Sequence, residues 1–466
     1  MFYEIPDSDA TALVSDAGER VTYAELARRV GAFASLGLGR ELCFCLCENS
    51  PSSVVGYLGM LNAGVVPLLV DRKIASGLLE NLLGLYQPRY LWVPREMADG
   101  FGGYHDRFAE GTYLLLEADV PTPVVLHDDL ALLLTTSGST GSPKLVRQSR
   151  RNIQSNAEAI VSYLDITSDE RAITTLPMNY TYGLSIINSH LQAQATILLT
   201  DRSMNMKPFW SFFAEEGATS FGGVPFTYQM LKRVRFFRMK LPSLRYMTQA
   251  GGKLPPELHT EFAQWAAEHD KRFIVMYGQT EATARMGYLP AEKSIEKAGS
   301  MGVAIPGGSF TLIDVDGNAI DEPGVTGELV YEGDNVTLGY AQGPADLALG
   351  DERHGRLETG DMAQRDDEGF YYIVGRKKRF LKIFGNRVNL DEVDRLLATA
   401  FEDLHCASTG VDDRMVTYVT DSARVEDVRE WLSATTHLSQ SAFDVRYIDA
   451  IPMSESGKVL YKDLPA

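Results

Sequence analysis

Two hydrophobic patterns alternate along the first part of the chain. Residues 42–46 and 65–70 are short runs of consecutive apolar side chains, which is typical of strands buried on both faces. Residues 54–61 lie between them and form an apolar stretch of helical length. The order strand, helix, strand predicts a parallel sheet with helices on both faces, because parallel neighbours need a crossover connection.

A helix with a marked start is predicted before the first of these strands. Thr22 can cap the helix, and Glu25 stands three residues later, which is the sequence pattern of a capping box. Leu26, Val30 and Phe33 then recur at helical spacing. They predict one apolar helix face that packs against the core.

Strand-like apolar segments continue through the rest of the chain. They are residues 132–134, 172–175, 196–199, 273–276, 327–331 and 416–420. A helix is expected around 425–432, and the Gly-, Asp- and Ala-rich residues 341–356 predict an exposed loop.

The composition changes near residue 375. Residues 375–379 read Gly-Arg-Lys-Lys-Arg, the densest basic run in the chain. Such a run by itself is typical of a solvated face. About 90 residues follow it, which is enough for a small separate domain.

Length and charge narrow the function classes. The chain has 466 residues, 44 basic and 62 acidic, and a formal net charge of −18. This length predicts two or three domains, and the acidic balance argues against a nucleic-acid or anionic-membrane partner. No apolar run reaches membrane-spanning length, and the start lacks the pattern of a signal peptide. A cytoplasmic protein is therefore expected.

Three of the four cysteines alternate in one predicted strand. Cys43, Cys45 and Cys47 share one face of that strand. We expect small apolar filling of a buried strand, because i, i+2 spacing is a poor clip for a tetrahedral metal ion. A structural disulfide is not implied.

The most informative stretch follows the apolar residues 132–134. Residues 135–144 read Thr-Thr-Ser-Gly-Ser-Thr-Gly-Ser-Pro-Lys. Glycine lets backbone N–H groups approach a polyanion, the hydroxyls add donors and Lys144 adds a positive charge, so the expected ligand is a phosphate chain. Pro143 stands before the lysine, which departs from the P-loop pattern. A Ser/Gly surface linker is the alternative.

Three further segments carry polar groups suited to a nucleotide. Residues 277–282 place a glycine, a hydroxyl and a carboxylate after a strand, which suits an ATP site at the carboxyl edge of a sheet. The alternative is a strand-to-helix turn that Thr280 caps. Asp361, which can accept hydrogen bonds from both ribose hydroxyls, precedes Arg376 at a specific spacing. Lys458 follows a proline-to-glycine turn near the C-terminus, where a solvated tail is the alternative.

These four ordered signals resemble the adenylate-forming superfamily, which includes acyl- and aryl-CoA synthetases, adenylation domains of nonribosomal peptide synthetases and firefly luciferase. They run from residue 136 to residue 458, so the resemblance covers nearly the whole chain. It implies ATP and Mg²⁺ as cofactors and a carboxylic acid as substrate. The acid attacks the α-phosphate to give an acyl-adenylate and pyrophosphate. A thiol, either of CoA or of an acyl or peptidyl carrier protein, then takes the acyl group.

The resemblance also implies an α/β fold. A large N-terminal domain over residues 1–375 would contain parallel-type sheets flanked by helices. Residues 376–379, with Lys378, would form a hinge to a small α+β C-terminal domain over 380–466. Rotation of the small domain would remove Lys458 from the site and bring Lys382 and Gly385 toward it for the second half-reaction.

Residue roles follow from matching positions. The phosphate-binding residues are Thr136, Ser137, Gly138, Ser139, Thr140, Gly141 and Lys144. The other nucleotide-binding residues are Gly251, Gly252, Tyr277 (at adenine), Gly278, Asp361 (at ribose) and Arg376. Glu281 is implied to hold Mg²⁺ and to act in catalysis with Thr280. Lys458 is implied to bridge the carboxylate and the α-phosphate.

The acid is less defined. Amino-acid-activating members of the superfamily carry an aspartate about where Thr181 stands, so a standard α-amino acid is disfavoured, because its buried ammonium would lack a partner. Many acyl-CoA synthetases have Phe-His where this chain has Asn179 and Tyr180. Tyr180, Thr181, Phe226 and Met286 are predicted to wall an apolar or aromatic pocket, with ordinary core packing as the alternative.

Three other functions stay open at this stage. A nucleotide-binding scaffold would bind ATP without turnover. A P-loop-type phosphohydrolase would release ADP rather than AMP and pyrophosphate. An adenylate-forming enzyme could also pass the acyl group to a non-thiol acceptor.

Overall fold

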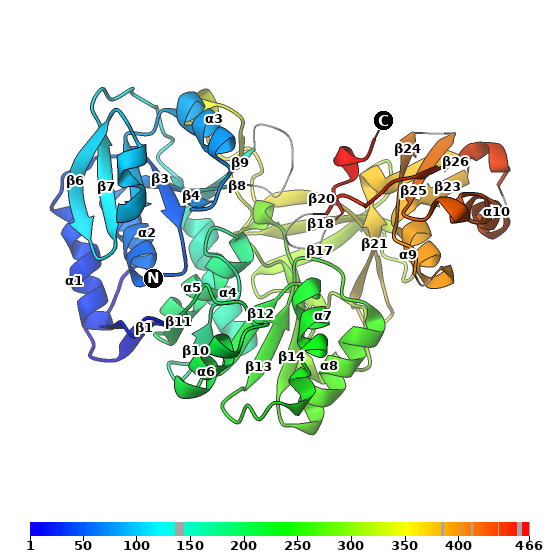
Figure 1. Ribbon diagram of the computed structural model, residues 1–466, viewed down its shortest axis with the longest axis horizontal. Helices are drawn as coiled ribbons and strands as arrows, with labels where there is room; N and C mark the ends of the chain where they lie inside the picture. The colour runs from blue at the N-terminus through cyan, green and yellow to red at the C-terminus, as the bar shows by residue number, and fades with distance from the viewer. Residues whose placement is uncertain are drawn as a thin grey trace. The chain divides into compact units, whose positions relative to one another are not determined.

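The computed structural model describes residues 1–466 except 136–143, 384–385, 402, 412, 437, 454–458 and 466. The chain divides into two compact units (Figure 1). Unit 1 comprises Met1–Ser309 and Glu332–Leu357, and unit 2 comprises Phe310–Tyr331 and Glu358–Ala466. Residues 376–379 therefore lie inside unit 2, and their role as a hinge stays a prediction.

Helices of unit 1 cover sheets that are parallel at their centres. These helices are α1 (Tyr23–Ala34), α2 (Pro51–Ala63), α3 (Ser76–Tyr86), α4 (Arg150–Leu164), α5 (Thr181–Gln192), α6 (Lys207–Glu215), α7 (Pro225–Arg233) and α8 (Pro256–Glu268). Unit 2 contains α9 (Leu390–Ala400) and α10 (Val425–Thr436). The mixed α/β class expected from the sequence is confirmed.

One sheet of unit 1 carries the strand that leads into the expected phosphate loop. Its order is β19 (Gly339–Ala341), β9 (Leu145–Ser149), β8 (Leu130–Thr135), β4 (Val66–Asp71), β3 (Leu42–Cys47), β5 (Tyr90–Pro94), β7 (Tyr113–Ala118) and β6 (Tyr104–Glu110). Strands β8, β4, β3 and β5 are parallel, and the neighbours at both ends are antiparallel.

Both faces of the central strands β8, β4, β3 and β5 are buried, as the sequence predicts. Alternate residues of β3 enter different cores: Cys43, Cys45 and Cys47 pack with α1 and α2, whereas Phe44 packs with Tyr86 of α3. The cysteines are buried and free, so their reading as apolar filling is confirmed. All six positions of β3 are buried, which explains its continuous apolar run.

A second sheet of unit 1 carries the strand before residues 277–282. Its order is β16 (Val303–Ala304), β15 (Gly287–Tyr288), β14 (Arg272–Tyr277), β13 (Tyr246–Gln249), β12 (Ser220–Gly223), β10 (Arg171–Ile173), β11 (Thr196–Leu199), β1 (Thr11–Ser15) and β2 (Arg20–Thr22). From β14 to β1 the neighbours are parallel. The polar residues at 277–282 therefore follow the carboxyl end of a parallel strand, where α/β folds bind ligands.

The predicted helix start is correct in position and differs in detail. Thr22 accepts a hydrogen bond from the Glu25 backbone N–H at 3.1 Å, and Leu26, Val30 and Phe33 are buried. The Glu25 carboxylate pairs with Arg28 at 2.6 Å. The side chain thus serves an i, i+3 ion pair on the exposed face of the helix.

Unit 2 combines short sheets with two helices. One sheet has the order β17 (Gly308–Ile313), β18 (Gly327–Gly333), β20 (Arg356–Arg365), β21 (Tyr371–Arg376). Others pair β22 (Phe380–Ile383) with β23 (Asn386–Asn389), and β24 (Cys406–Val411) with β25 (Arg414–Val419) and β26 (Phe443–Tyr447). A core shared by the last five strands with α9 and α10 holds residues from Leu381 to Val445.

The expected loop at 341–356 is only partly irregular. Most of its side chains are exposed or half-buried. Its 3₁₀ turn, Pro344–Ala348, however, buries Leu347 in the hydrophobic core that includes residues of β4 and β8. Strand β19 ends at Ala341, the first residue of this segment.

Candidate active site

The expected phosphate loop joins two paired strands. Leu134 of β8 lies opposite Val146 of β9, and Thr135 lies opposite Leu145. Thr136, Ser137, Gly138, Ser139, Thr140 and Gly141 lie outside the described residues. Lys144 leads directly into strand β9. In a P-loop the lysine opens a helix, so the P-loop alternative does not fit this architecture.

A tyrosine joins Lys144 to Glu281. The Lys144 Nζ lies 5.3 Å from the centre of the Tyr340 ring, and the Tyr340 hydroxyl donates to the Glu281 carboxylate at 2.6 Å. Tyr340 belongs to β19, where it lies opposite Val146 of β9. Two predicted site residues therefore share one neighbour that the sequence did not single out.

The electrostatics of this contact keep the phenol protonated. Burial, and after it the negative charge of Glu281, raises the pKa of Tyr340 to about 12. The Arg353 guanidinium lies 4.7 Å from the ring centre and acts in the opposite direction. At neutral pH the hydroxyl is therefore a hydrogen-bond donor that orients Glu281.

The Glu281 backbone is anchored separately from its side chain. Its carbonyl accepts hydrogen bonds from the Thr337 N–H at 3.0 Å, the Thr337 hydroxyl at 2.9 Å and Arg353 at 2.9 Å. In the described part of the chain, no cation pairs with the Glu281 carboxylate. A carboxylate held by a neutral donor keeps its charge available to a ligand.

The turn that carries Glu281 is strained. Thr283 and Ala284 have φ angles of 53° and 98°, which non-glycine residues rarely adopt. At Gly278 an added Cβ would lie 1.6 Å from the Ala284 carbonyl oxygen, so glycine is required. Thr280 opens the 3₁₀ turn Thr280–Ala282, and Gln279 holds the cap position. The structure thus differs from the alternative in which Thr280 caps a helix.

The two predicted glycines lie against the predicted acid pocket. Gly251 has a φ of 81°, and a Cβ there would lie 2.6 Å from the Tyr180 hydroxyl oxygen. At Gly252 a Cβ would lie 3.1 Å from Pro225. Tyr180 directly precedes helix α5 and Thr181 begins it. The sequence therefore places a small residue where the Tyr180 ring comes close.

The remaining predicted residues of unit 1 have varied surroundings. Tyr277 ends β14, and its hydroxyl accepts a hydrogen bond from Gln279 at 3.3 Å. Met286 is fully buried, whereas Phe226 on α7 is half-exposed. Neither Phe226 nor Met286 lines the cavity described next.

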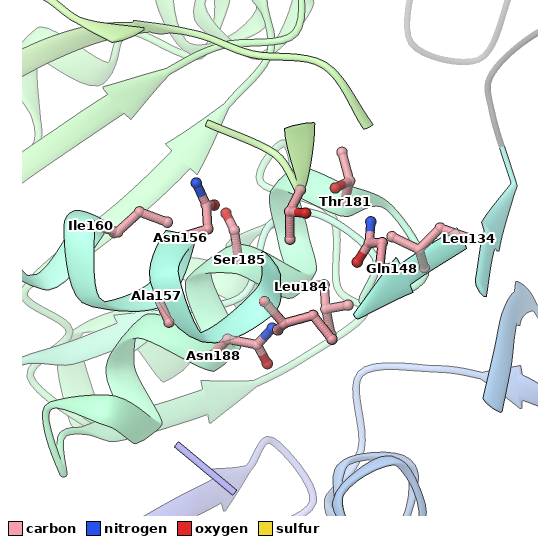
Figure 2. A pocket seen from close by; sticks show the side chains of 11 residues that line it. Leu134, Gln148, Asn156, Ala157, Ile160, Thr181, Leu184, Ser185 and Asn188 are labelled. Atoms are coloured by element: carbon pink, nitrogen blue, oxygen red, sulfur yellow. The ribbon is translucent and has the colours of Figure 1, made fainter. Parts of the chain in front are cut away.

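A small cavity lies between α4, α5 and the turn after Glu281 (Figure 2). Its volume is ≈ 10 Å³, room for about one water molecule. Thr181 is part of the wall. The lining residues are Leu134, Gln148, Ile153, Asn156, Ala157, Ile160, Thr181, Leu184, Ser185, Asn188 and Thr283. The polar members Gln148, Asn156, Ser185 and Asn188 were missed, because their spacing matches no known motif.

Asp361 and Arg376 meet within unit 2. They lie directly opposite each other on β20 and β21, and Arg376 Nε lies 3.1 Å from Asp361 Oδ1. Asp361 is buried and Arg376 is exposed. The sequence spacing between the two segments therefore reflects a direct cross-strand pair.

The basic run is largely ion-paired. Lys377 lies 2.6 Å from Glu328, and Arg379 lies 2.8 Å from Asp391 and 2.7 Å from Asp394. A purely solvated face, the simple reading of such a run, does not describe Arg379, which is buried.

The residues proposed for domain motion are described only in part. Lys378 lies in the 3₁₀ turn Lys377–Arg379, and Lys382 lies in β22. Gly385 and Lys458 lie outside the described residues. Met453 and Val459 form an antiparallel bridge on either side of the Lys458 segment.

The described residues contain neither a membrane-spanning helix nor a preformed metal site. No helix there is long and apolar enough to cross a membrane; the cytoplasmic location stays a prediction. No group of three or more His, Cys, Asp or Glu side chains there is arranged to hold a metal ion.

Comparison with known proteins identifies the family. The model of the family "AMP-binding enzyme" matches residues 6–341. The feruloyl-CoA synthase of an Amycolatopsis species is 27% identical over 97% of this chain and 94% of its own length. The sulfoacetate–CoA ligase of Cupriavidus necator is 28% identical over 96% of this chain and 92% of its own length.

Solved structures share the fold. ATP-bound MatB from Rhodopseudomonas palustris superposes with a TM-score of 0.78 at 23% identity, covering 99% of this chain and 97% of that one. The superfamily resemblance seen in the sequence is thus confirmed. The chain belongs to the AMP-binding enzyme family, the adenylate-forming enzymes, and its class of activity is AMP-forming acid–thiol ligation.

Proposed function

We propose that this chain is an ATP- and Mg²⁺-dependent carboxylate–AMP ligase that forms an acyl-adenylate, releases pyrophosphate and passes the acyl group to CoA. One observation carries the proposal: Lys144 and Glu281, expected at the phosphates and the metal, meet around the Tyr340 ring. A cation and a carboxylate on two sides of one tyrosine ring, brought together from the ends of two different sheets, suit a nucleotide with its divalent ion.

Glu281 fits the expected metal. Magnesium in nucleotide sites is commonly held by one or two carboxylates together with phosphate oxygens, so a single suitable carboxylate is enough. The Glu281 side chain accepts a hydrogen bond from a neutral phenol. When bound, the metal would neutralise phosphate charge.

The other nucleotide contacts are assigned by the same proposal. Lys144 and residues 136–141 bind the β- and γ-phosphates, and Thr280, Gly251, Gly252 and Gly278 shape the surrounding wall. Tyr277 lines the adenine site. Asp361 binds the ribose, and its pairing with Arg376 holds the carboxylate in place.

Unit 2 has the moving parts in this proposal. Lys458 draws the acid carboxylate and the α-phosphate together, since two anions otherwise repel each other. Lys378 is the hinge, and Lys382 and Gly385 belong to the face used in the second half-reaction.

The family relationship does not choose the acid. One similar protein is a feruloyl-CoA synthase, whose name specifies an aromatic acid. Another is a sulfoacetate–CoA ligase, whose name specifies a small acid with two negative charges. Tyr180, Thr181, Phe226 and Met286 stay the proposed wall of the acid pocket. CoA is the proposed acceptor because both names specify it; a carrier-protein thiol is the competing outcome.

The test measures AMP and pyrophosphate with ATP, Mg²⁺ and a panel of acids, first without a thiol. We expect both products with at least one acid, followed by an acyl-CoA once CoA is added. Glu281→Gln and Lys458→Ala should each lower pyrophosphate release by about 100-fold or more. Lys240→Ala, which changes an exposed lysine in the irregular segment before β13, should not. ADP as product, or ATP binding without turnover on any acid, would refute the proposal.

A further inference from the structure

Arg285 is a buried cation that contacts helix α5, the helix that begins at the predicted acid-pocket residue Thr181. It stands four residues after Glu281 and is only 3% exposed. Through the described part of the chain, no carboxylate forms an ion pair with it. Buried arginines normally pair with an acid, so this guanidinium needs another explanation.

The groups around Arg285 are all neutral. Nε donates to the Ser185 hydroxyl at 3.1 Å, and Nη1 donates to the Tyr163 hydroxyl at 3.1 Å and lies 3.2 Å from the Met276 sulfur. The guanidinium carbon lies 5.1 Å from the centre of the Tyr182 ring. Among the described residues, none accepts a hydrogen bond from Nη2.

The neighbouring phenols do not supply the missing charge. Burial raises the pKa of both Tyr163 and Tyr182 above the ordinary value, although the nearby guanidinium opposes the shift. Burial and, to a smaller degree, Arg285 also keep His190 neutral by lowering its pKa. The positive charge is therefore solvated by dipoles and an aromatic face only.

The cavity beside Arg285 offers further unused polar groups. Ser185, which accepts from Arg285, forms part of its wall (Figure 2). Both polar atoms of the Gln148 side chain, Asn156 Oδ1 and Asn188 Oδ1 are buried without a partner among the described residues. Unsatisfied buried polar atoms cost free energy and are uncommon in native folds.

Size and chemistry point to a polar head group. The cavity is too small for an aromatic ring and has room for about one water molecule. Arg285 does not itself line the cavity, but its hydrogen-bond partner Ser185 does. One oxygen of an anion that displaced this water would meet Ser185 and the carboxamide side chains, and the guanidinium lies directly behind Ser185. An ammonium would be repelled by Arg285, in agreement with the sequence argument against an α-amino acid.

Building on the proposed function, we propose that the acid activated by this chain carries a second anionic group, which Arg285 binds while the first carboxylate reacts. One carboxylate oxygen forms the bond to the α-phosphorus and pyrophosphate leaves. The second anion, a carboxylate or a sulfonate, stays unchanged and compensates the buried guanidinium.

The test compares acids that differ by one charge. Pyrophosphate release is measured for butyrate against succinate, propionate against malonate, and acetate against sulfoacetate. The dianionic member of at least one pair should have a kcat/KM at least about 10-fold higher in the native chain, and the third pair separates sulfonate from carboxylate.

The variant Arg285→Met assigns this preference to the residue. It should lose about 100-fold or more on the preferred dianion and keep its rate on the monoanion, while Arg285→Lys should lie between the two. Arg272→Met is the matched control, since Arg272 also lies over a tyrosine ring, 5.2 Å from the Tyr246 centre, but is less buried and pairs with Asp165. It should keep the native preference.

If activity is too low to measure, binding of the dianion can be tested by its effect on the melting temperature. The preferred dianion should raise the melting temperature of the native chain and not that of Arg285→Met. The proposal is overturned if monoanions are the better substrates, or if Arg285→Met slows both members of a pair equally. Should Arg285→Met not fold, the preference of the native chain and of Arg285→Lys decides. A native chain that releases no pyrophosphate with any acid would instead refute the proposed function.

Discussion

At the scale of single residues, a few hydrogen bonds set the position and orientation of the Glu281 carboxylate. Glu281 contributes its carbonyl to Thr337 and Arg353 and its carboxylate to Tyr340. The backbone contacts fix where the side chain begins, and the phenol fixes where it points. Tyr340 is therefore a positioning residue, and Glu281 is the residue proposed to contact the metal.

Tyr340→Phe should lower kcat/KM for pyrophosphate release by about 10-fold, because the carboxylate loses one neutral hydrogen bond but keeps its charge. Glu281→Gln should cost much more. The metal concentration for half-maximal rate should rise in Tyr340→Phe, which a purely structural effect would not cause. Tyr447→Phe removes a similar tyrosine–carboxylate bond, 2.8 Å to Asp449, on the surface of unit 2 and should have no effect. An unchanged metal dependence in Tyr340→Phe would contradict the positioning role.

At the scale of elements, the strained turn after β14 sets the position of Glu281. Two consecutive residues with positive φ end the 3₁₀ turn Thr280–Ala282. Asn335 holds the turn in place, since its side chain donates to the carbonyls of Ala282 and Arg285 at 2.8 and 3.0 Å. The contacts from residues 335–337 thus maintain a conformation that alanine alone disfavours.

Ala284→Gly should relieve part of this strain and raise the free energy of unfolding by about 1 kcal/mol or less, since glycine also gains entropy in the unfolded chain. Gly278→Ala should do the opposite and lower activity strongly, because its Cβ would overlap the Ala284 carbonyl oxygen. Denaturant unfolding measures both. Gly77→Ala in α3, where a Cβ meets open space, is the matched control and should be neutral or stabilising. Destabilisation by Ala284→Gly would show that the turn is not strained.

At the scale of the whole molecule, buried neutral histidines link stability to pH. His190 Nδ1 lies 2.8 Å from the Ile186 carbonyl and Nε2 lies 3.2 Å from the Tyr246 hydroxyl. Nδ1 therefore carries the proton and Nε2 accepts. Burial lowers the pKa of His190 to about 4, and that of His259 likewise.

The sign of the resulting pH dependence is fixed. Above pH 6.5 both histidines are neutral in the folded and in the unfolded chain. In that range they make no contribution to the pH dependence of the free energy of unfolding. As the pH falls from 6.5 toward 4, only the unfolded state takes up the proton, and His190 alone should cost about 3 kcal/mol. His190→Asn should therefore have a flatter dependence of unfolding free energy on pH in this window. Equal slopes for His190→Asn and the native chain would contradict the assignment.

The sequence by itself determined the class of fold, most of the elements and the family. Apolar runs such as 196–199 became strands with the same bounds, because continuous burial leaves a local trace in composition. The four motifs identified the adenylate-forming enzymes, since glycine, hydroxyl and charged residues at fixed spacing meet strict chemical demands.

Only the tertiary structure decided which distant residues meet. Strand β19 has three residues and is defined by its pairing with β9, so Tyr340 had no local signal. Arg285 reads in the sequence as one more polar residue after Glu281. Its meaning comes from neutral neighbours on β14, α4 and α5 that bury a charge without compensating it. Burial and electrostatic compensation depend on the path of the whole chain, and no short stretch of sequence records them.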